Sequence, residues 1–520
     1  MRLFRMNLGQ TRARLVQAGA ALAVAALVAG CGNNYRPVVM PINSSGPAPQ
    51  PQSFAVVVSA PSPTAPGIAT IIDYSGDTVM ARAPIGPGPT TFSVDQTGTT
   101  GYTVNSDSTL TNFPVSSSLQ AKNVTYSTLP SGADPAGIFS PTAGMWIADL
   151  NGNVADVMTG SPAGFRLAVP VATTPVTIVG LPAIGQRNYA ISQNFDAPSG
   201  VNPNGVACNL SPTTAPVNGI ATPIEVASYS PDTPIPLGLC PVFGIESSDG
   251  RRLFVLNRGD DTITVINSQI NALDTCTPFL NQAGQQVTCH PSLPLSTTAV
   301  TATGITPPNG TTGMTATAGP VYAEYNIATS QLVVADYDGG TISVIDVSLD
   351  EYGNDSPTFG TTFTIPVGNN PASVTVLYDG SRAYTANQGD CTPNCTASQN
   401  GTVSIVNLSS HTLEKTLSVV GYPRTVVSTQ NSEYGKVYVA SPNSNYLTII
   451  RTDLDIVVPL TGSIEGNIVD VRVSTQNGSA GNSDNNSRTP GHGQPCNLPP
   501  GLMASTYGAN YTLAQCRTLP

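Results

Sequence analysis

The sequence is poor in charged residues and in histidine. Only 10% of the 520 residues are charged, and histidine occurs three times, at His290, His411 and His492. Histidine-built zinc, copper and iron centres, and serine–histidine nucleophile systems, need histidines that the chain hardly offers. We therefore expect no metal ion or other cofactor, and the sequence leans against an enzyme without deciding the point.

Basic residues are also scarce. The chain has 20 Lys and Arg against 31 Asp and Glu, a net charge of −11. Residues 1–30 hold four arginines and no acid, so the rest of the chain carries 16 basic and 31 acidic residues, a charge near −15. An acidic body repels phosphate backbones, which excludes nucleic acid as an expected partner.

Amphipathic helical patterns are missing after residue 30. The chain instead has 49 glycines and 46 prolines, and short apolar runs separated by Ser, Thr and Asn. This composition is typical of many short strands joined by turns.

The N-terminus has the order of an export signal. Arginines are followed by an apolar stretch at 15–28, too short to span a membrane comfortably, and then by Leu-Val-Ala-Gly-Cys at 27–31. These residues resemble the lipobox of bacterial lipoproteins, which implies that Cys31 is lipidated and residues 1–30 are removed. Gly32, rather than Asp, follows the cysteine, so the resemblance implies an outer-membrane anchor facing the periplasm or the cell surface. The alternative is an ordinary secretory signal.

Three further regions follow the signal peptide. Residues 31–53 are rich in proline and small polar residues, and read as the anchor and its extended tether. Residues 54–475 hold a repeat, and residues 476–520 read as a Ser/Asn/Gly linker with a disulfide-looped tail.

The repeat is a unit of about 45 residues with four short strands. Its clearest strand ends in Asn, Asp or Ser and occurs seven times, at 101–105, 145–149, 188–192, 253–257, 332–336, 383–387 and 437–441. A strand with period-two alternation follows it along the chain, and then come a less regular strand, a G-x-x-P turn and the last strand of the unit. One such unit cannot bury both faces, so units must stack, and a ring removes the exposed ends. The pattern predicts an all-β propeller; tandem sandwiches need longer repeats.

The repeat also resembles a known family. Val-Tyr-Val-Ala at 437–440 and Ile-Pro-Val-Gly-Asn-Asn-Pro at 365–371 are similar to the YVTN repeats of exported bacterial propellers. The resemblance covers roughly residues 54–475, and implies fold, export and often surface display, but no reaction.

The number of blades is expected to be eight, although propellers of this family usually have seven. Seven complete units lie between about 89 and 466. Segments 54–59, 68–73 and 79–85 resemble all strands of a unit except the innermost, and 468–473 resembles an innermost strand. Joined, these pieces form one composite blade; a seven-bladed ring with loose ends is the alternative.

Eight cysteines remain besides Cys31. An even number in an exported protein indicates disulfides. Because each pair lies on neighbouring loops of the expected strand order, we predict the bridges Cys208–Cys240, Cys276–Cys289, Cys391–Cys395 and Cys496–Cys516.

Two acidic turns, at 149–153 and 336–340, look like fragments of calcium loops. Asn105, Asn257 and Asn387 occupy the same position in other units, which favours turn chemistry common to every blade. Neither fragment has the closing Glu of a calcium loop.

Insertions are the informative feature for function. Three insertions should emerge on the face that carries the G-x-x-P turns: residues 194–222, 303–318 and 387–400. Two others should emerge on the opposite face: residues 268–292 and 349–360. Asp134, Tyr422, Arg424 and Glu465 are candidate residues at the mouth of the channel. We expect a lipid-anchored binding or scaffold module with a protein or carbohydrate ligand; the alternative is a lactonase-like or sugar-active enzyme.

Overall fold

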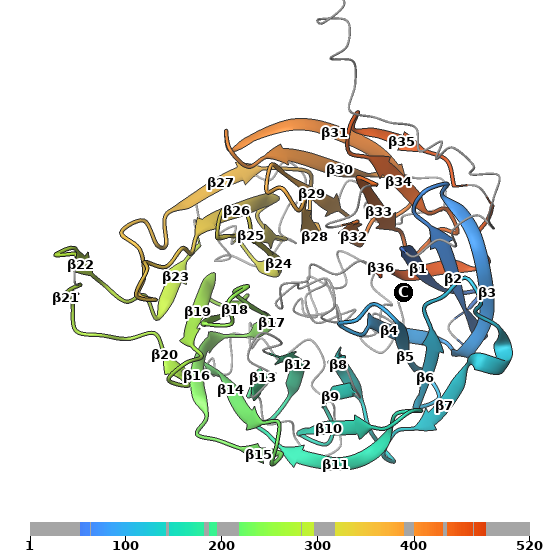
Figure 1. The fold of residues 1–520 in the computed structure, drawn as a ribbon, viewed down its shortest axis with the longest axis horizontal. Coiled ribbons are helices and arrows are strands. Elements are labelled where there is room, and N and C mark those ends of the chain that lie inside the picture. Colours follow the sequence, from blue (N-terminus) through green and yellow to red (C-terminus); the bar gives the residue numbers. More distant parts are fainter. Residues whose placement is uncertain are drawn as a thin grey trace, which may run out of the picture. The chain divides into compact units, whose positions relative to one another are not determined.

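Short antiparallel strands make up nearly all of the regular structure. The computed structural model describes residues 53–62, 64–141, 145–180, 187–194, 218–281, 283–295, 318–388, 400–429, 434–460 and 462–474. In these residues, eight separate sheets of four strands, two of them with a divided outer strand, are arranged around a centre (Figure 1). The domain is therefore an eight-bladed β-propeller, as the strand count predicts.

Each blade is numbered here in ring order, and its strands are given from the centre outward. Blades 1 to 4 are β36 (Asn467–Val473), β1 (Phe54–Ala60), β2 (Pro66–Asp73) and β3 (Thr78–Pro87); β4 (Pro89–Val94), β5 (Thr100–Asn105), β6 (Thr109–Pro114) and β7 (Thr125–Thr128); β8 (Pro135–Phe139), β9 (Met145–Asp149), β10 (Val154–Thr159) and β11 (Gly164–Pro170); and β12 (Pro175–Gly180), β13 (Arg187–Ser192), β14 (Asn218–Glu225), with β15 (Ser230–Pro231) and β16 (Ile235–Leu239) outermost. A 3-10 turn, η1 (Ala121–Asn123), precedes β7.

Blades 5 to 8 follow the same plan. They are β17 (Pro241–Glu246), β18 (Arg252–Asn257), β19 (Thr262–Asn267), with β20 (Ala272–Leu273) and β23 (Ser292–Pro294) outermost; β24 (Pro320–Asn326), β25 (Gln331–Asp336), β26 (Thr341–Asp346) and β27 (Thr362–Pro366); β28 (Pro371–Val376), β29 (Arg382–Asn387), β30 (Asn400–Asn407) and β31 (Thr412–Val420); and β32 (Thr425–Ser428), β33 (Lys436–Ala440), β34 (Thr448–Arg451) and β35 (Ile456–Val458).

Blade 1 joins the two ends of the propeller sequence. β36 pairs antiparallel with β1, with Ala55 opposite Val473 and Val57 opposite Val471. The main chains of Phe54 and Ser474 close the pair: Ser474 N donates to Phe54 O at 2.8 Å, and Phe54 N to Ser474 Oγ at 2.7 Å. The expected composite blade is therefore present, and the seven-bladed alternative is wrong.

The strand order gives the domain two distinct faces. Turns from the fourth strand of one blade to the first of the next emerge on the same face as turns from second to third strands; we name this the insertion face. Turns between first and second strands, and between third and fourth strands, form the opposite face, named the terminal face. Phe54 begins a second strand and Ser474 follows a first strand, so both described ends of the propeller chain lie on the terminal face.

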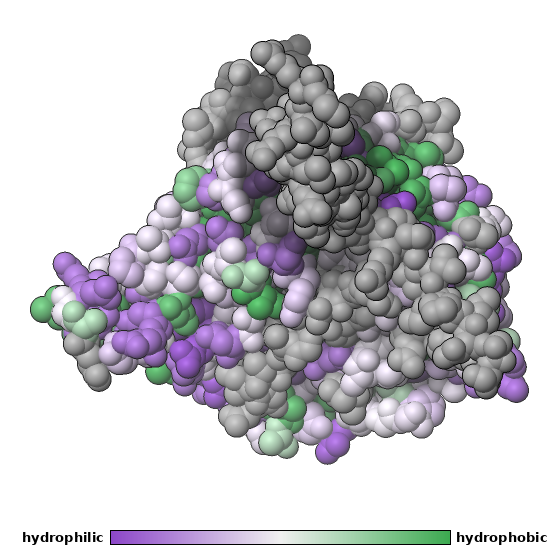
Figure 2. Space-filling model, turned by 45° about the horizontal axis from the view of Figure 1, so that its top comes forward, coloured by the Kyte–Doolittle hydropathy of each residue, from purple (hydrophilic) through white to green (hydrophobic). Residues whose placement is uncertain are grey.

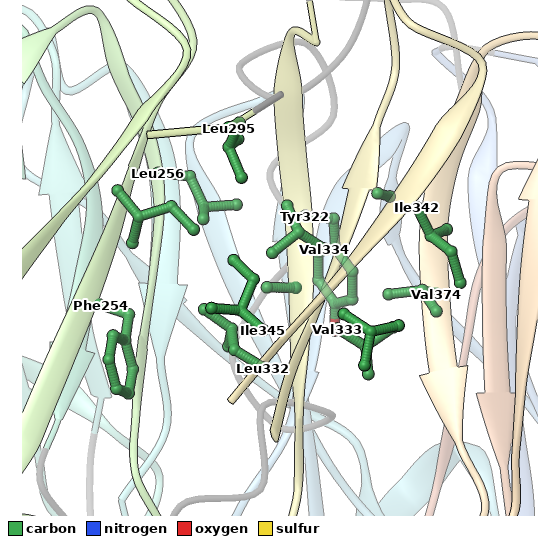
Figure 3. Packing of buried hydrophobic residues seen from close by; sticks show 14 of the residues in the cluster. Phe254, Leu256, Leu295, Tyr322, Leu332, Val333, Val334, Ile342, Ile345 and Val374 are labelled. Carbon is green, nitrogen blue, oxygen red and sulfur yellow. The ribbon is translucent and has the colours of Figure 1, made fainter. Parts of the chain in front are cut away.

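The core lies between neighbouring blades. Figure 3 shows Phe254 and Leu256 of β18 facing side chains of the next blade, such as Leu332 of β25, and Val374 of β28 packing from the blade beyond. Blades are held face to face by this burial because a single sheet has two apolar faces to cover.

Polar latches on the terminal face also join blades. A cation at the start of the second strand reaches the third-to-fourth turn of the following blade in four places. The latches are Arg187 to Ser268 O, Arg252 to Asp355, Arg382 to Asp455 and Lys436 to Asp77. Lys436 Nζ lies 2.5 Å from Asp77 Oδ2 and ties blade 8 to the composite blade.

The insertion in blade 5 differs from expectation in where it leaves the fold. β20 and β23 both pair with β19, so the segment between them interrupts the outermost strand. Its hairpin, β21 (Phe279–Leu280) with β22 (Gln286–Val287), therefore extends outside the ring (Figure 1) and not from the terminal face alone. A disulfide between Cys276 and Cys289, one of the four predicted pairs, closes this insertion.

The described part of the chain contains no helix long and apolar enough to cross a membrane. Cys31, Cys208, Cys391, Cys395, Cys496 and Cys516 lie outside the described residues, as does the predicted tail; Cys240 is disulfide-bonded.

Candidate functional site

A repeated hydrogen-bond network builds the turns of the insertion face. In blade 7, Asn387 Nδ2 donates to Thr402 Oγ1 at 3.0 Å and Ser404 Oγ at 2.9 Å, and Gly368 N donates to the same serine at 3.1 Å. Asn105 and Asn257 make the corresponding bonds to two hydroxyls of the third strand in blades 2 and 5. A Cβ at Gly368 would collide with the Asn387 amide, which explains why the G-x-x-P turn begins with glycine.

The two acidic turns belong to this network. Asp336 Oδ2 accepts hydrogen bonds from Thr341 Oγ1 at 3.1 Å and Ser343 Oγ at 2.7 Å, in the place of the asparagine amide. Asp149 Oδ1 accepts the main-chain N–H groups of Asp134, Asn151 and Gly152 at 2.8, 3.1 and 3.2 Å. In the described residues, no three His, Cys, Asp or Glu side chains gather as metal ligands. These carboxylates act in turn chemistry, as the repeat suggested.

The residue that follows each second strand is equivalent in six blades. In blades 2 to 7, its N–H donates to the carbonyl of the residue that precedes the proline of the same blade's first strand. Blades 2 and 3 place Ser106 and Leu150 there. Blades 4 to 7 place large polar side chains at this position, all at most 8% exposed: Gln193, Arg258, Tyr337 and Gln388. We name these four residues the polar arc.

Arg258 and Tyr337 are the most connected members of the arc. The guanidinium of Arg258 donates to both carboxylate oxygens of Asp338, the shortest bond being 2.9 Å, and lies 5.3 Å from the centre of the Tyr337 ring. Burial raises the pKa of Tyr337 well above its usual value, and the hydrogen-bonded phenol of Tyr422 raises it further. Tyr337 is therefore neutral at physiological pH and links blade 6 to a turn of blade 8.

Neighbouring turns complete the cluster. Asn370 Nδ2 donates to Tyr337 O at 3.1 Å, and Gln388 N donates to Asn370 O at 3.0 Å. In blade 4, Gln193 Nε2 donates to Pro241 O at 3.2 Å. The polar arc is thus tied to the first-strand turns nearest the centre.

The structure separates the four candidate mouth residues. Tyr422 contacts the arc through Tyr337. Arg424 is buried two residues further along, and its carbonyl accepts a hydrogen bond from Ser373 Oγ at 2.8 Å. Asp134 lies in the turn before blade 3. Glu465 pairs with Arg82 of the outermost strand of blade 1 at 3.3 Å, so its carboxylate is directed away from the centre.

Sequence reasoning missed Arg258, Tyr337 and Gln388. Each stands directly after the Asn or Asp that ends a clear repeat strand. Aligning the repeats on that residue and comparing the next position would have found them, because four consecutive blades carry large polar residues there and blades 2 and 3 do not.

The three insertions expected on the insertion face start and end at described residues of that face. They connect β13 to β14, β23 to β24 and β29 to β30, and their central parts lie outside the described residues. They belong to blades 4 to 7, the same blades that supply the arc. In the view of Figure 2, hydrophobic residues of the described surface are scattered among hydrophilic ones.

Comparisons with known proteins show the fold alone. No family model matches the chain, and no curated protein matches it either. Apo AztD from Citrobacter koseri is similar in structure, with a TM-score of 0.50 at 12% identity, over 81% of this chain and 97% of that one. A putative 6-phosphogluconolactonase from Bacteroides fragilis has a TM-score of 0.47 at 14% identity, over 82% and 99% of the two chains. Dihydro-heme d1 dehydrogenase NirN, in complex with DHE, has a TM-score of 0.49 at 14% identity, over 82% and 77%.

Proposed function

We propose that this chain is an exported, lipid-anchored propeller of the YVTN-repeat type that binds a ligand on its insertion face. The observation that carries the proposal is the polar arc, because side chains at one repeated position change character only in the blades that bear the long insertions. Sites on propellers and similar scaffolds are built from loops held by rigid strands.

The proposed membrane anchor is the lipid on Cys31. The lipobox-like sequence ending at Cys31 supports lipidation, and the propeller chain begins at the terminal face. A flexible tether of this length has a typical span on the order of 25 Å, which would keep the domain near the membrane that holds the lipid. A Cys31→Ala variant is expected to lose labelling by radioactive palmitate; retained labelling would remove the anchor from the proposal.

Photo-crosslinking tests which face binds. Benzoylphenylalanine in place of Tyr422 on the insertion face is compared, in living cells, with the same replacement of Tyr378, an exposed tyrosine in a first-to-second turn of the terminal face. Both changes exchange one aromatic ring for another, so the two variants are matched. We expect discrete cross-linked products from position 422 and none from position 378. Products from position 378 alone would contradict the proposed face.

A further inference from the structure

Gln388 has a buried side-chain amide that makes no hydrogen bond. The residue is 1% exposed, and neither Oε1 nor Nε2 has a partner. A buried donor and acceptor without partners carry a desolvation penalty, which hydrogen bonds from another molecule would remove. The amide of Gln193, at the same position of blade 4, does find a partner in Pro241 O.

Gln388 has polar surroundings, and no residue of the polar arc carries a charge without an ionic partner. Its main chain bonds to Asn370, which bonds to Tyr337, whose phenol meets that of Tyr422. Arg258, the only cation of the arc, is neutralised by Asp338. The arc therefore offers a ligand amides and phenols, and its one cation is already paired.

The arrangement favours a sugar over a peptide. Extended peptides bind by adding a strand to an open sheet edge. The arc presents turn side chains, and the unpaired edges of the outermost strands lie at the circumference. A sugar hydroxyl both donates and accepts, as the Gln388 amide does, and the partly exposed Tyr422 offers a ring to the apolar face of a sugar.

We propose that the Gln388 amide, with Tyr422 and Tyr337, forms a subsite for an uncharged, hydroxyl-rich glycan on the insertion face. The inference rests on the proposed function and names the ligand class of that same face. The bonds that a glycan makes to Gln388 replace those that the amide lacks in the free protein.

The test uses the purified chain without its lipid on an array of neutral hexose and N-acetylhexosamine oligosaccharides, with uronic-acid oligosaccharides as the acidic set. Titration calorimetry with the best neutral oligosaccharide then compares wild type with Gln388→Met, which keeps side-chain length and removes both polar atoms. Gln331→Met, on the terminal face, is the matched control. We expect binding to the neutral set only, weakened roughly tenfold or more by Gln388→Met and unchanged by Gln331→Met.

A second readout separates loss of a ligand contact from loss of the fold. Because Gln388→Met removes an unpartnered buried amide, the free variant is expected to melt at or above the wild-type temperature. The subsite would be overturned if Gln388→Met left binding unchanged or if only acidic glycans bound. It would also be overturned if no neutral glycan bound and a crystal structure showed only an ordered water on Gln388. If glycan binding does not depend on Gln388 but position 422 still gives cross-linked products, the proposed binding face stands and only the subsite is wrong. If neither glycan binding nor cross-linking at position 422 is found, the proposed function is wrong as well.

Discussion

Asp336 places a carboxyl group at the repeat position that holds asparagine in blades 2, 5 and 7. The side-chain oxygens of Asn105 and Asn387 accept hydrogen bonds from the hydroxyls of Thr103 and Thr385, two residues earlier in the same strand, at 3.0 and 2.9 Å. Blades 5 and 6 have Val255 and Val334 in the threonine positions, and Oδ1 of both Asn257 and Asp336 is unpartnered there. Burial, above all, raises the pKa of Asp336 to about 7.

Replacing Asp336 with asparagine should stabilise the protein in a pH-dependent way. In the unfolded chain the carboxyl titrates near pH 4, so the free energy of unfolding of the wild type falls between about pH 4 and pH 7 and stays low above pH 7. Asp336→Asn removes that loss, so the variant's advantage should grow to on the order of 4 kcal/mol at pH 8. Urea unfolding at pH 5 and pH 8 measures it, with Asn257→Asp as the reverse change. An equal effect at both pH values would argue against the buried carboxyl.

Sequence reasoning at this scale identified the repeated Asn and Asp positions, because their neighbours in the chain carry the pattern. It did not identify the Asp338 partner of Arg258 or the outward direction of Glu465. These depend on which blades become neighbours and on the path of the loop before β36, and neither is encoded locally.

Second strands were the most predictable elements, because each is buried along its length except for the first residue of four of them. Outer strands were not: β15 and β16 divide one, and β20 and β23 divide another around the disulfide-closed insertion. An outermost strand has a partner on one side only, so its sequence is less constrained and tolerates interruption.

The latch between blades 8 and 1 provides a test of how elements are joined. Lys436 Nζ also donates to Tyr74 O at 2.6 Å, and the pair with Asp77 is largely withdrawn from solvent. Lys436→Met leaves the Asp77 carboxyl buried without its cation, a loss of about 3–5 kcal/mol. Adding Asp77→Asn should recover much of this loss, because the buried charge is then gone. A double-mutant cycle in urea measures the coupling; strictly additive single effects would show that the latch does not join the blades.

At the scale of the whole molecule, ring closure determines on which face the chain ends and the long loops lie. The strand patterns at 54–85 and 468–473 predicted the composite blade because each fragment alone leaves edges and an apolar face unpaired. Closure by β36 then places both ends of the propeller chain on the terminal face and leaves the opposite face to the polar arc. The identity of a ligand is not contained in this architecture, since propellers with the same ring carry different sites.

Deleting β36 tests ring closure most directly. Four apolar side chains of this strand are at most 3% exposed: Ile468, Val469, Val471 and Val473. Their burial contributes on the order of 6 kcal/mol or more to the free energy of unfolding. We compare thermal unfolding of a variant lacking residues 467–474 with one lacking residues 476–520, which keeps the strand. The account predicts a sharp fall of the melting temperature, or no cooperative transition, in the first variant and little change in the second. An unchanged melting temperature without residues 467–474 would contradict a ring closed by the two ends of the chain.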